Sequence, residues 1–522
     1  MYKKARYLRA FLLYNLSMKK LIPIIFFITV LFLAFIMSAN VKYFDFDLWA
    51  RLIAGMGVID GHTVLKQDFL SYTPTHIWYD HEYGSGIVFY FLLKHFGAYS
   101  LIFFQSLLIF GIFCFITQTI KLRETKHPYD FLFFLFPIIA LTSNFGSPIR
   151  CHLFSFLFFT IYIFILEFVR KNNKPKLLYI LPFLTIIWNN LHGGVVAGLG
   201  LIAMYAFGEL LNKKDIRHYI FSGILSSLVL VINPWGIEYI KFLLMANSMH
   251  RPNVVEWFSI FHKFQLHRQI PFKIYLGLLF LLESFVLYKN IKYGKNEFCN
   301  KLVNCDKVKL IVLLVTTYLA ISHVKLIPFL VITGCIYCYE DYEKYIQILL
   351  PERVKTLTLK LVFAVGLFAI LSKNYSLPMG ETIYPHREVE FIKINDLKGD
   401  VLVNFGLGSF VSYKLYPHNK IYMDGRYEEV YYDEMEPLLA KFYLVKEGWN
   451  EVLLKYPPDI MIIEKYYPVY QKLQSEPEWK LVYPTENYGV FVRTKDFKNK
   501  YTLPDNNLEY YKNTLFDTSI KF

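Results

Sequence analysis

The sequence predicts a polytopic α-helical membrane protein of about 11 transmembrane helices, followed by a C-terminal extracytoplasmic α/β domain. Three observations predict this class: the hydrophobic composition, the placement of the basic residues, and a change of pattern after residue 372. Of the 522 residues, 55% are hydrophobic and 19% are aromatic, which is more than the core of a soluble protein holds. Much of the surface is therefore expected to face lipid.

The formal net charge of +14 reflects where Lys and Arg lie along the chain. A nucleic-acid-binding protein gathers its basic residues on one face or along one groove. Here they lie in clusters between apolar runs, which is typical of cytoplasmic loops under the positive-inside rule. We therefore expect no nucleic-acid partner.

The first basic cluster lies in residues 1–20, which are expected to form a cytoplasmic N-terminus. It precedes the apolar run Leu21 to Met37, which is long enough to cross a bilayer as a helix. The run is longer than the core of a signal peptide, and no small-residue cleavage site follows it. We therefore expect a retained first span.

Further apolar runs follow, and each basic cluster comes after an even-numbered crossing. The runs are Tyr99 to Ile120, Phe131 to Ser147, Cys151 to Val169, Leu177 to Trp188, Val195 to Leu211, His218 to Ile232, Phe272 to Tyr288, Leu310 to Ser322, Leu326 to Tyr339 and Leu357 to Leu371. Gly84 to Phe96 is too short to span and is expected to be re-entrant or interfacial. Residues 21–372 thus form the predicted membrane domain, with a large first outer loop at 39–98.

Cysteine usage predicts no disulfide framework. The six cysteines, which lie in predicted spans or in one inner loop, are Cys114, Cys151, Cys299, Cys305, Cys335 and Cys338. Cys335 and Cys338 have CxxC spacing, but no second ligand pair accompanies them, which favours a structural role over a metal or redox role.

Residues 373–522 are expected to form a separate extracytoplasmic domain, because short strand-like segments there alternate with helical ones. The predicted strands are Val401 to Asn404, Lys420 to Met423, Asp459 to Ile463, Trp479 to Tyr483 and Val490 to Arg493, and the predicted helices are Glu434 to Val445 and Gly448 to Lys455. Gly406, Gly408 and Ser409 lack the rest of a dinucleotide fingerprint and indicate a tight turn.

Polar residues gather at outer helix ends and in outer loops of this topology. They include Asp45, Asp47, Arg51, Asp68, Asp80, His81, Glu82, Arg150, His152, Asn189, Asn190, His192, Asn233, Glu256, His323 and Lys325. A transporter holds its ionisable groups near the bilayer midplane, whereas an enzyme acting on a lipid-linked substrate needs them at the interface. The pattern favours the enzyme. A lipid-linked sugar flippase and a non-catalytic scaffold for envelope polysaccharide assembly remain alternatives.

Several motifs point to one superfamily. They are Asp45-Phe-Asp-Leu-Trp-Ala-Arg-Leu52, Trp78-Tyr-Asp-His-Glu82, Arg150-Cys-His152, Trp188-Asn-Asn-Leu-His-Gly-Gly194, Asn233-Pro-Trp-Gly236, Glu256-Trp257 and Asp424-Gly-Arg426. Together they resemble bacterial multi-pass membrane proteins of the C-type (GT-C) glycosyltransferase superfamily. That branch usually has Trp-Trp-His-Leu where this chain has Trp49-Ala50-Arg51-Leu52.

The resemblance implies a glycosyltransferase of the cell inner (plasma) membrane. Superfamily members such as protein O-mannosyltransferases and aminoarabinose transferases take a sugar from a polyprenyl phosphate and pass it to an acceptor hydroxyl. The implied partners are a polyprenyl-phosphate-linked sugar and membrane lipid. The resemblance places the catalytic aspartate in the first outer loop, where we expect Asp47 or Asp45 to act as general base.

The expected substrate-binding residues are Asp80, His81, Glu82, Arg150, His152, Asn190, His192, Lys325 and Arg426. Arg150 and Lys325 are the candidate phosphate ligands, although either side chain can instead snorkel to the interface. Arg426 can instead pair with Asp424 and hold its turn. Asp47, His81 and Glu82 are candidate ligands of a divalent cation such as Mg or Mn. Neither the donor sugar nor the oligomeric state follows from the sequence.

Overall fold

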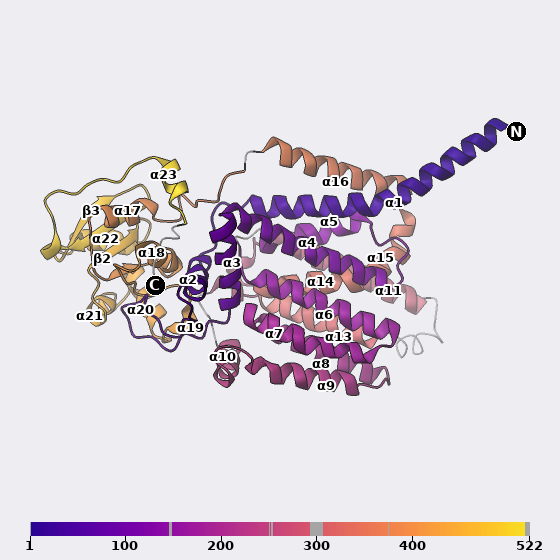
Figure 1. Cartoon of the computed structure of the whole chain (residues 1–522), viewed down its shortest axis with the longest axis horizontal. Coiled ribbons are helices and arrows are strands. Elements are labelled where there is room, and N and C mark those ends of the chain that lie inside the picture. The colour runs from indigo at the N-terminus through magenta and orange to yellow at the C-terminus, as the bar shows by residue number, and fades with distance from the viewer. Residues whose placement is uncertain are drawn as a thin grey trace.

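The computed structural model describes residues 2–145, 149–249, 251, 254–292, 306–373 and 375–516. A long bundle of helices carries a smaller α/β domain at one end (Figure 1). The bundle end next to the C-terminal domain, where α1 ends at Ala39, is called the proximal end. The other end, where α4 ends at Leu122, is called the distal end.

Each run predicted to cross the bilayer contains a helix. The bundle helices are α1 (Tyr2–Ala39), α4 (Tyr99–Leu122), α5 (Phe131–Phe145), α6 (His152–Asn172), α7 (Leu181–Leu191), α8 (Val196–Leu211), α9 (Arg217–Leu228), α11 (Ile270–Lys292), α13 (Lys307–Ser322), α14 (Ile327–Tyr337), α15 (Tyr339–Tyr345) and α16 (Glu352–Ser372). In the described ranges, six helical segments are each long and apolar enough to cross a membrane: Leu21–Ala39, Tyr99–Leu122, His152–Asn172, Gly193–Leu211, Ile270–Lys289 and Glu352–Ser372.

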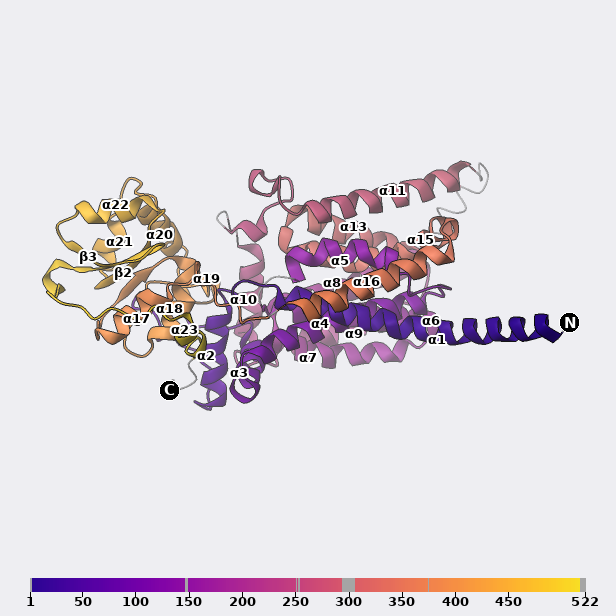
Figure 2. The same cartoon turned by 90° about the horizontal axis from the view of Figure 1, so that it is seen from above.

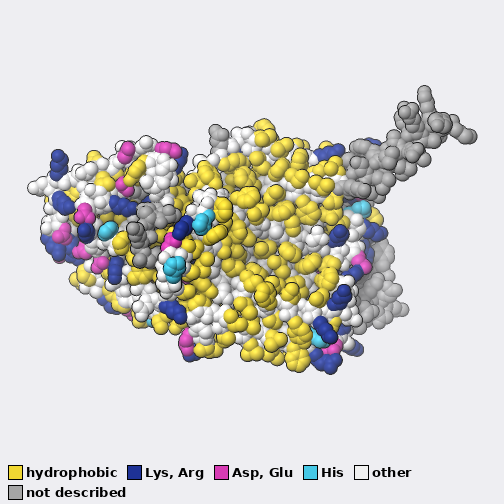
Figure 3. All heavy atoms as spheres, viewed as in Figure 1, with side chains coloured by type: hydrophobic (Ala, Val, Ile, Leu, Met, Phe, Trp, Pro, Cys, Tyr) yellow, Lys and Arg dark blue, Asp and Glu magenta, His cyan; other side chains and the backbone are white. Residues whose placement is uncertain are grey.

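The surface of the bundle confirms that this is a membrane protein. Apolar side chains cover the bundle between its two ends, and charged side chains gather at the distal end and on the C-terminal domain (Figure 3). Phe280 on α11 is 72% exposed and Phe368 on α16 is 71% exposed. A soluble monomer rarely exposes so wide an apolar patch, whereas lipid contact requires one.

Buried ion pairs join the bundle helices at the distal end. Arg123 Nη1 lies 2.8 Å from Glu167 Oε2 of α6. Arg170 Nε lies 2.9 Å from Glu209 Oε1 of α8, and its Nη2 lies 2.8 Å from Asp306 Oδ1 before α13. Because buried charges need partners, these pairs hold the ends of four bundle helices in one arrangement.

The first loop contains two helices. α2 (Leu48–Ile59) and α3 (Tyr83–Phe96) lie at the proximal end and run across the direction of the bundle helices (Figure 1 and Figure 2). Their backbones touch, because a Cβ at Gly55 would lie 2.2 Å from the carbonyl oxygen of Gly86. The sequence predicted a helix at α3 but only loop at α2, and it also missed α10 (Ile237–Ser248).

The C-terminal domain is built on a four-stranded sheet. Its strands are β1 (Val401–Val403), β2 (Ile460–Glu464), β3 (Trp479–Pro484) and β4 (Tyr488–Arg493). Their order is β1-β2-β4-β3, with β1 parallel to β2 and the other neighbours antiparallel. The helices are α17 (His386–Ile394), α18 (Gly408–Leu415), α19 (Tyr427–Val430), α20 (Met435–Tyr443), α21 (Glu451–Lys455), α22 (Pro468–Ser475) and α23 (Leu508–Asn513).

Four predicted strands and both predicted helices are present, but the strand predicted at Lys420 to Met423 is wrong. Only Ile421 forms bridges there, one to Val401 and one to Ser71 of the first loop. The segment lies between β1 and the first loop and shares its backbone hydrogen bonds between them. With one bridge on each side, the segment is too short to form a strand.

Four of the six cysteines lie in the described part of the chain. Cys114, Cys151, Cys335 and Cys338 carry free thiols. Cys299 and Cys305 lie outside the described residues.

A buried ion-pair cluster fastens the C-terminal domain to the first loop. Arg426 Nη1 lies 2.6 Å from Asp68 Oδ1, and its Nε lies 2.9 Å from Asp424 Oδ1, with all three side chains fully buried. The guanidinium also lies 4.7 Å from the centre of the Trp78 ring. Removing one partner of such a cluster leaves an uncompensated buried charge, so the loop and the domain are expected to fold together.

Candidate functional site

The segment between α1 and α2 holds the two candidate catalytic aspartates. Asp45 is buried and forms an ion pair with Arg150, which also pairs with Glu256. Its Oδ1 accepts a hydrogen bond from the backbone N–H of Asp47 at 3.0 Å. Burial raises the pKa of Asp45, and the charge of Arg150 opposes that shift. The carboxylate of Asp45 is thus held in an ion pair with Arg150.

Asp47 precedes the first residue of α2, and its side chain is half-buried. Among the described residues, no group donates a hydrogen bond to its carboxylate. The carboxylate lies against the backbone of Gly425, where an added Cβ would come within 2.5 Å of Asp47 Oδ1. Burial, and after it the charge of Asp45, raises the pKa of Asp47 well above its usual range.

Arg51 on α2 joins the first loop to the C-terminal domain. It is buried and forms an ion pair with Asp80. Its Nη2 lies 2.9 Å from Glu429 Oε2 of α19, and its Nε lies 3.5 Å from Glu82 Oε2. The same oxygen of Glu429 accepts a hydrogen bond from Trp78 Nε1 at 2.9 Å. Three carboxylates from two parts of the chain therefore share one guanidinium.

Two histidines border this cluster. His192 Nε2 lies 3.2 Å from Glu82 Oε1, and His81 Nδ1 lies 2.9 Å from Glu429 Oε1. His192 Nδ1 lies 2.7 Å from Ser155 Oγ. Burial would raise the pKa of Glu82, but the hydrogen bond from His192 and the charges of His81 and Arg51 lower it well below its usual range. Glu82 thus orients the ring of His192, whereas Glu429 orients the ring of His81.

His81, Glu82 and Glu429 place possible ligand atoms within 4.8 Å of one another. One imidazole and two carboxylates suit a divalent cation, but Arg51 already contacts both carboxylates. A bound cation would have to displace that guanidinium or lie beside it. Asp47, the third candidate ligand from the sequence, is not part of this group. The residues fit an ion-pair cluster better than a resident metal.

A cavity of about 130 Å³ lies beside the cluster. Its polar and aromatic lining includes His81, His152, His192, Arg251, Trp257 and Lys325, and α10 contributes Phe242 and Leu243. The cavity brings together residues from the first loop, from α6, from the turn after α7 and from the segment before α14.

Two cavity-lining groups have unused bonding capacity in the described part of the chain. His152 Nε2 is buried and has no hydrogen-bond partner among the described residues. Lys325 forms no ion pair with any described residue, and its Nζ lies 5.4 Å from the centre of the Trp257 ring. Buried polar atoms normally find partners, so an unpaired one at a cavity indicates a ligand. A cation and an N–H donor together favour an anion such as a phosphate.

The structure does not bring all the predicted binding residues to this cavity. His81, His152, His192 and Lys325 line it, and Glu82 lies one hydrogen bond away. Arg150 is occupied by Asp45 and Glu256, and Asp80 by Arg51. These two therefore hold other side chains in place.

Asn190 and Arg426, two further predicted binding residues, form their hydrogen bonds and ion pairs inside the protein. Asn190 Nδ2 donates to the carbonyl oxygens of Ile186 and Ile232 at 2.8 and 2.9 Å. Its Oδ1 accepts from Tyr83 at 2.5 Å. Arg426 is fully buried against Asp68 and Asp424. Asn190 thus holds backbone and Arg426 holds side chains, and neither residue lines the cavity.

Glu429 and Arg251 were missed by the sequence prediction. Glu429 comes three residues after the Asp424-Gly-Arg426 motif, and this closeness to the motif was the one feature of the sequence that pointed to it as a site residue. Arg251 lies in a long loop whose path the sequence does not reveal. Its guanidinium carbon lies 4.6 Å from the centre of the Trp257 ring.

No protein-family model matches the chain. No curated protein matches it by sequence. Its structure is similar to that of the Archaeoglobus fulgidus oligosaccharyltransferase. The apo form gives a TM-score of 0.50 at 9% identity, covering 84% of this chain and 69% of that chain. The form of the same enzyme that is tethered to an acceptor peptide gives a TM-score of 0.51 at 9% identity. That comparison covers 91% of this chain and 75% of the oligosaccharyltransferase chain.

The mycobacterial arabinofuranosyltransferase AftD gives a TM-score of 0.45 at 10% identity, covering 91% of this chain and 40% of that chain. At 9% identity, the likeness to the oligosaccharyltransferase is one of fold. The chain therefore shares its fold with this oligosaccharyltransferase, and the likeness agrees with the fold that the resemblance of its motifs implies.

The cavity is expected to bind a phosphate monoester carried on an apolar chain. We expect farnesyl phosphate to bind the purified protein, and Lys325→Ala to weaken that binding about tenfold or more, because a charge-assisted hydrogen bond contributes about 1.5–3 kcal/mol. Calorimetric titration in detergent measures this. Farnesol and the exposed-lysine variant Lys263→Ala are the controls. Equal affinity of Lys325→Ala and the wild type would contradict the assignment.

Proposed function

We propose that the protein is a membrane glycosyltransferase that moves a sugar from a polyprenyl-phosphate donor to an acceptor hydroxyl on an envelope glycan, lipid or protein. One observation carries the proposal: no described group donates a hydrogen bond to the carboxylate of Asp47, and, besides burial, the nearby charge of Glu82 raises its pKa. Glu82 in turn contacts His192 at the cavity that Lys325 and His152 also line. A base and an anion site side by side suit group transfer from a phosphate. The fold of the chain agrees with that reaction class.

Asp47 is proposed as the general base. It removes the proton of the acceptor hydroxyl while that oxygen forms a bond to the anomeric carbon of the sugar. The bond from that carbon to the donor phosphate oxygen breaks, and its electron pair stays on the departing polyprenyl phosphate. The raised pKa of Asp47 makes it a stronger base than an ordinary aspartate.

Lys325 and His152 are proposed to stabilise the negative charge that develops on the phosphate. Both line the cavity, and both have bonding capacity that the described residues do not use. His152 can donate from Nε2 when the ring carries its proton there. Groups held in place before the reaction stabilise charge at little reorganisation cost.

Asp45 and Arg150 are proposed to position Asp47. Arg150 fixes Asp45, and Asp45 accepts the backbone N–H of Asp47. The carboxylate of Asp45 also contributes to the raised pKa of Asp47. Asp45 thus acts on the reaction through Asp47.

An apolar groove offers a place for the polyprenyl chain. It runs between α8 and α9, has a volume of about 1010 Å³, and is lined by residues such as Leu199, Phe207 and Ile224. At one end it reaches Ile240 of α10, and the next residues of that helix, such as Phe242, line the cavity. A lipid in the groove could therefore place its phosphate in the cavity.

The proposed topology places the proximal end outside the cell. The chain would cross the inner membrane of a bacterium eleven times, with residues 1–20 in the cytoplasm, 21–372 in the membrane domain and 373–522 outside. The basic clusters, which gather at the distal end of this arrangement, support that orientation.

The first test is transfer from a panel of radiolabelled polyprenyl-phosphate sugars. We expect Asp47→Asn to lower turnover about 100-fold or more, because general base catalysis contributes about 10²–10⁴-fold. Donor binding should be unchanged. The exposed-residue variant Asp433→Asn is the matched control. Full activity of Asp47→Asn would show that another group acts as the base, whereas no transfer by the wild type from any donor would favour the flippase or the scaffold.

The pH dependence of transfer tests the environment of Asp47. A general base acts only when it is deprotonated, and the pKa of Asp47 is raised. The value of kcat/KM should therefore rise with pH, and the midpoint of that rise should lie well above the usual aspartate pKa of about 3.9. Asp45→Asn removes a neighbouring negative charge, so the midpoint should move to lower pH. A midpoint that stays in place or moves upward would show that another group titrates.

A further inference from the structure

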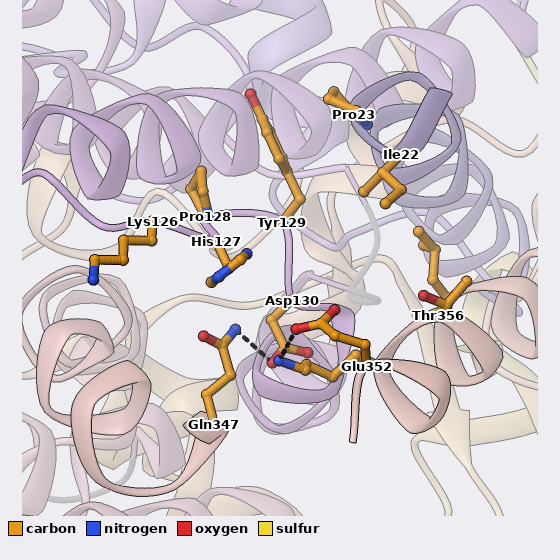
Figure 4. A pocket seen from close by; sticks show the side chains of 12 residues that line it. Ile22, Pro23, Lys126, His127, Pro128, Tyr129, Asp130, Gln347, Glu352 and Thr356 are labelled. Atoms are coloured by element: carbon orange, nitrogen blue, oxygen red, sulfur yellow. Dashed lines mark hydrogen bonds and ion pairs between the residues drawn. The ribbon is translucent and has the colours of Figure 1, made fainter. Parts of the chain in front are cut away.

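A second cavity lies at the distal end of the bundle, far from Asp47 in the fold. It has a volume of about 330 Å³, within the range of about 300–1,000 Å³ typical of small-molecule sites. α1, the loop between α4 and α5, and α16 form its walls. Figure 4 shows Asp130 beside Gln347, with Lys126 on one side and Ile22 and Pro23 on the other.

Asp130 brings a negative charge to the cavity wall. The side chain is 4% exposed. Its Oδ2 accepts hydrogen bonds from Gln347 Nε2 at 2.8 Å and from Tyr342 at 3.0 Å, and its Oδ1 accepts one from the N–H of Leu132. All three donors are neutral, and no cation of the described chain pairs with this carboxylate. Since a buried charge is costly without a counter-charge, the site favours a ligand with a cationic N–H group.

The cavity also offers a positive charge. Lys126 is exposed and forms no ion pair with the described residues. Lys355 is already paired with Glu352, with Nζ 2.6 Å from Oε1. The lining thus carries two lysines and two carboxylates, which suits a ligand with both charges better than a simple anion.

The apolar wall of the cavity continues into the lipid-facing surface. Ile22 lies in the first apolar segment and Leu359 in α16. Further along these two helices, Ile24 is 55% exposed and Leu361 is 61% exposed. A ligand with hydrocarbon chains can therefore place its polar part in the cavity and its chains along α1 and α16.

We propose that this cavity binds the headgroup of a phosphatidylethanolamine-type phospholipid from the leaflet at the distal end. The ammonium group donates to Asp130, the phosphate lies at Lys126, and the acyl chains lie along α1 and α16. The site is independent of the proposed transferase activity, since none of its residues lies near Asp47 or the first cavity.

The test uses the full-length protein in detergent with dioctanoyl phospholipids. We expect dioctanoyl-phosphatidylethanolamine to bind about tenfold tighter than two other dioctanoyl phospholipids. Phosphatidylglycerol lacks the ammonium group, and phosphatidylcholine has an ammonium group without N–H donors. Dioctanoyl-phosphatidylethanolamine should also bind tighter than water-soluble phosphoethanolamine. Equal binding of phosphoethanolamine would overturn the lipid assignment, and equal binding of the other phospholipids would overturn the ammonium contact.

Two variants locate the site. Lys126→Ala should weaken binding of dioctanoyl-phosphatidylethanolamine about tenfold, because it removes the phosphate contact from an exposed position. Asp130→Asn should abolish the preference over phosphatidylglycerol. Lys174→Ala, another exposed lysine of the distal end, is the matched control and should bind like the wild type. Unchanged affinity of Lys126→Ala would place the lipid elsewhere and overturn the proposal.

Discussion

The guanidinium of Arg51 lies among three carboxylates, Asp80 and Glu82 from the first loop and Glu429 from the C-terminal domain. All of these side chains are buried. Charges of this kind are stable inside a protein only when each has its partner, and the loss of one partner costs about 3–5 kcal/mol. The first loop and the C-terminal domain therefore cannot separate without exposing or stranding these charges.

The same docking shapes the surroundings of Asp47. It brings Gly425 against the carboxylate, so one wall of the proposed catalytic site comes from the C-terminal domain. Arg426, the next residue, is held by Asp68 of the first loop. The Asp-Gly-Arg motif thus combines two tasks: the arginine fixes the domain, and the glycine leaves room for the carboxylate of Asp47.

The charged side chains of this protein fall into two groups. At the distal end, Arg123 and Arg170 are matched by carboxylates on neighbouring helices, which suits a fixed scaffold. At the proximal end, Lys325 and His152 keep bonding capacity beside a cavity, and Asp47 has no donor among the described residues. Structural charges are satisfied within the protein, whereas charges that serve a ligand stay available to it.

The sequence predicted most of the helices because apolar length and loop charge are local signals. It missed α2 because Leu48, Trp49 and Leu52 are buried by partners far along the chain, as in the contact of Trp49 with Phe410. It also suggested many candidate binding residues without showing which were already paired. The contact between Arg51 and Glu429 joins residues 378 positions apart, and no local pattern reveals such a pair.

The most direct test of this account is the single-turnover rate of sugar transfer in Gly425→Ala. The added Cβ would meet the flexible end of Asp47, so the fold should tolerate it while the carboxylate moves. We predict a rate lower by about 100-fold with donor affinity unchanged, because a misplacement of about 1 Å can cost that much. Gly406→Ala, which meets only Asn404 Oδ1 at 3.8 Å, should transfer normally. A wild-type rate in Gly425→Ala would contradict the role assigned to Asp47.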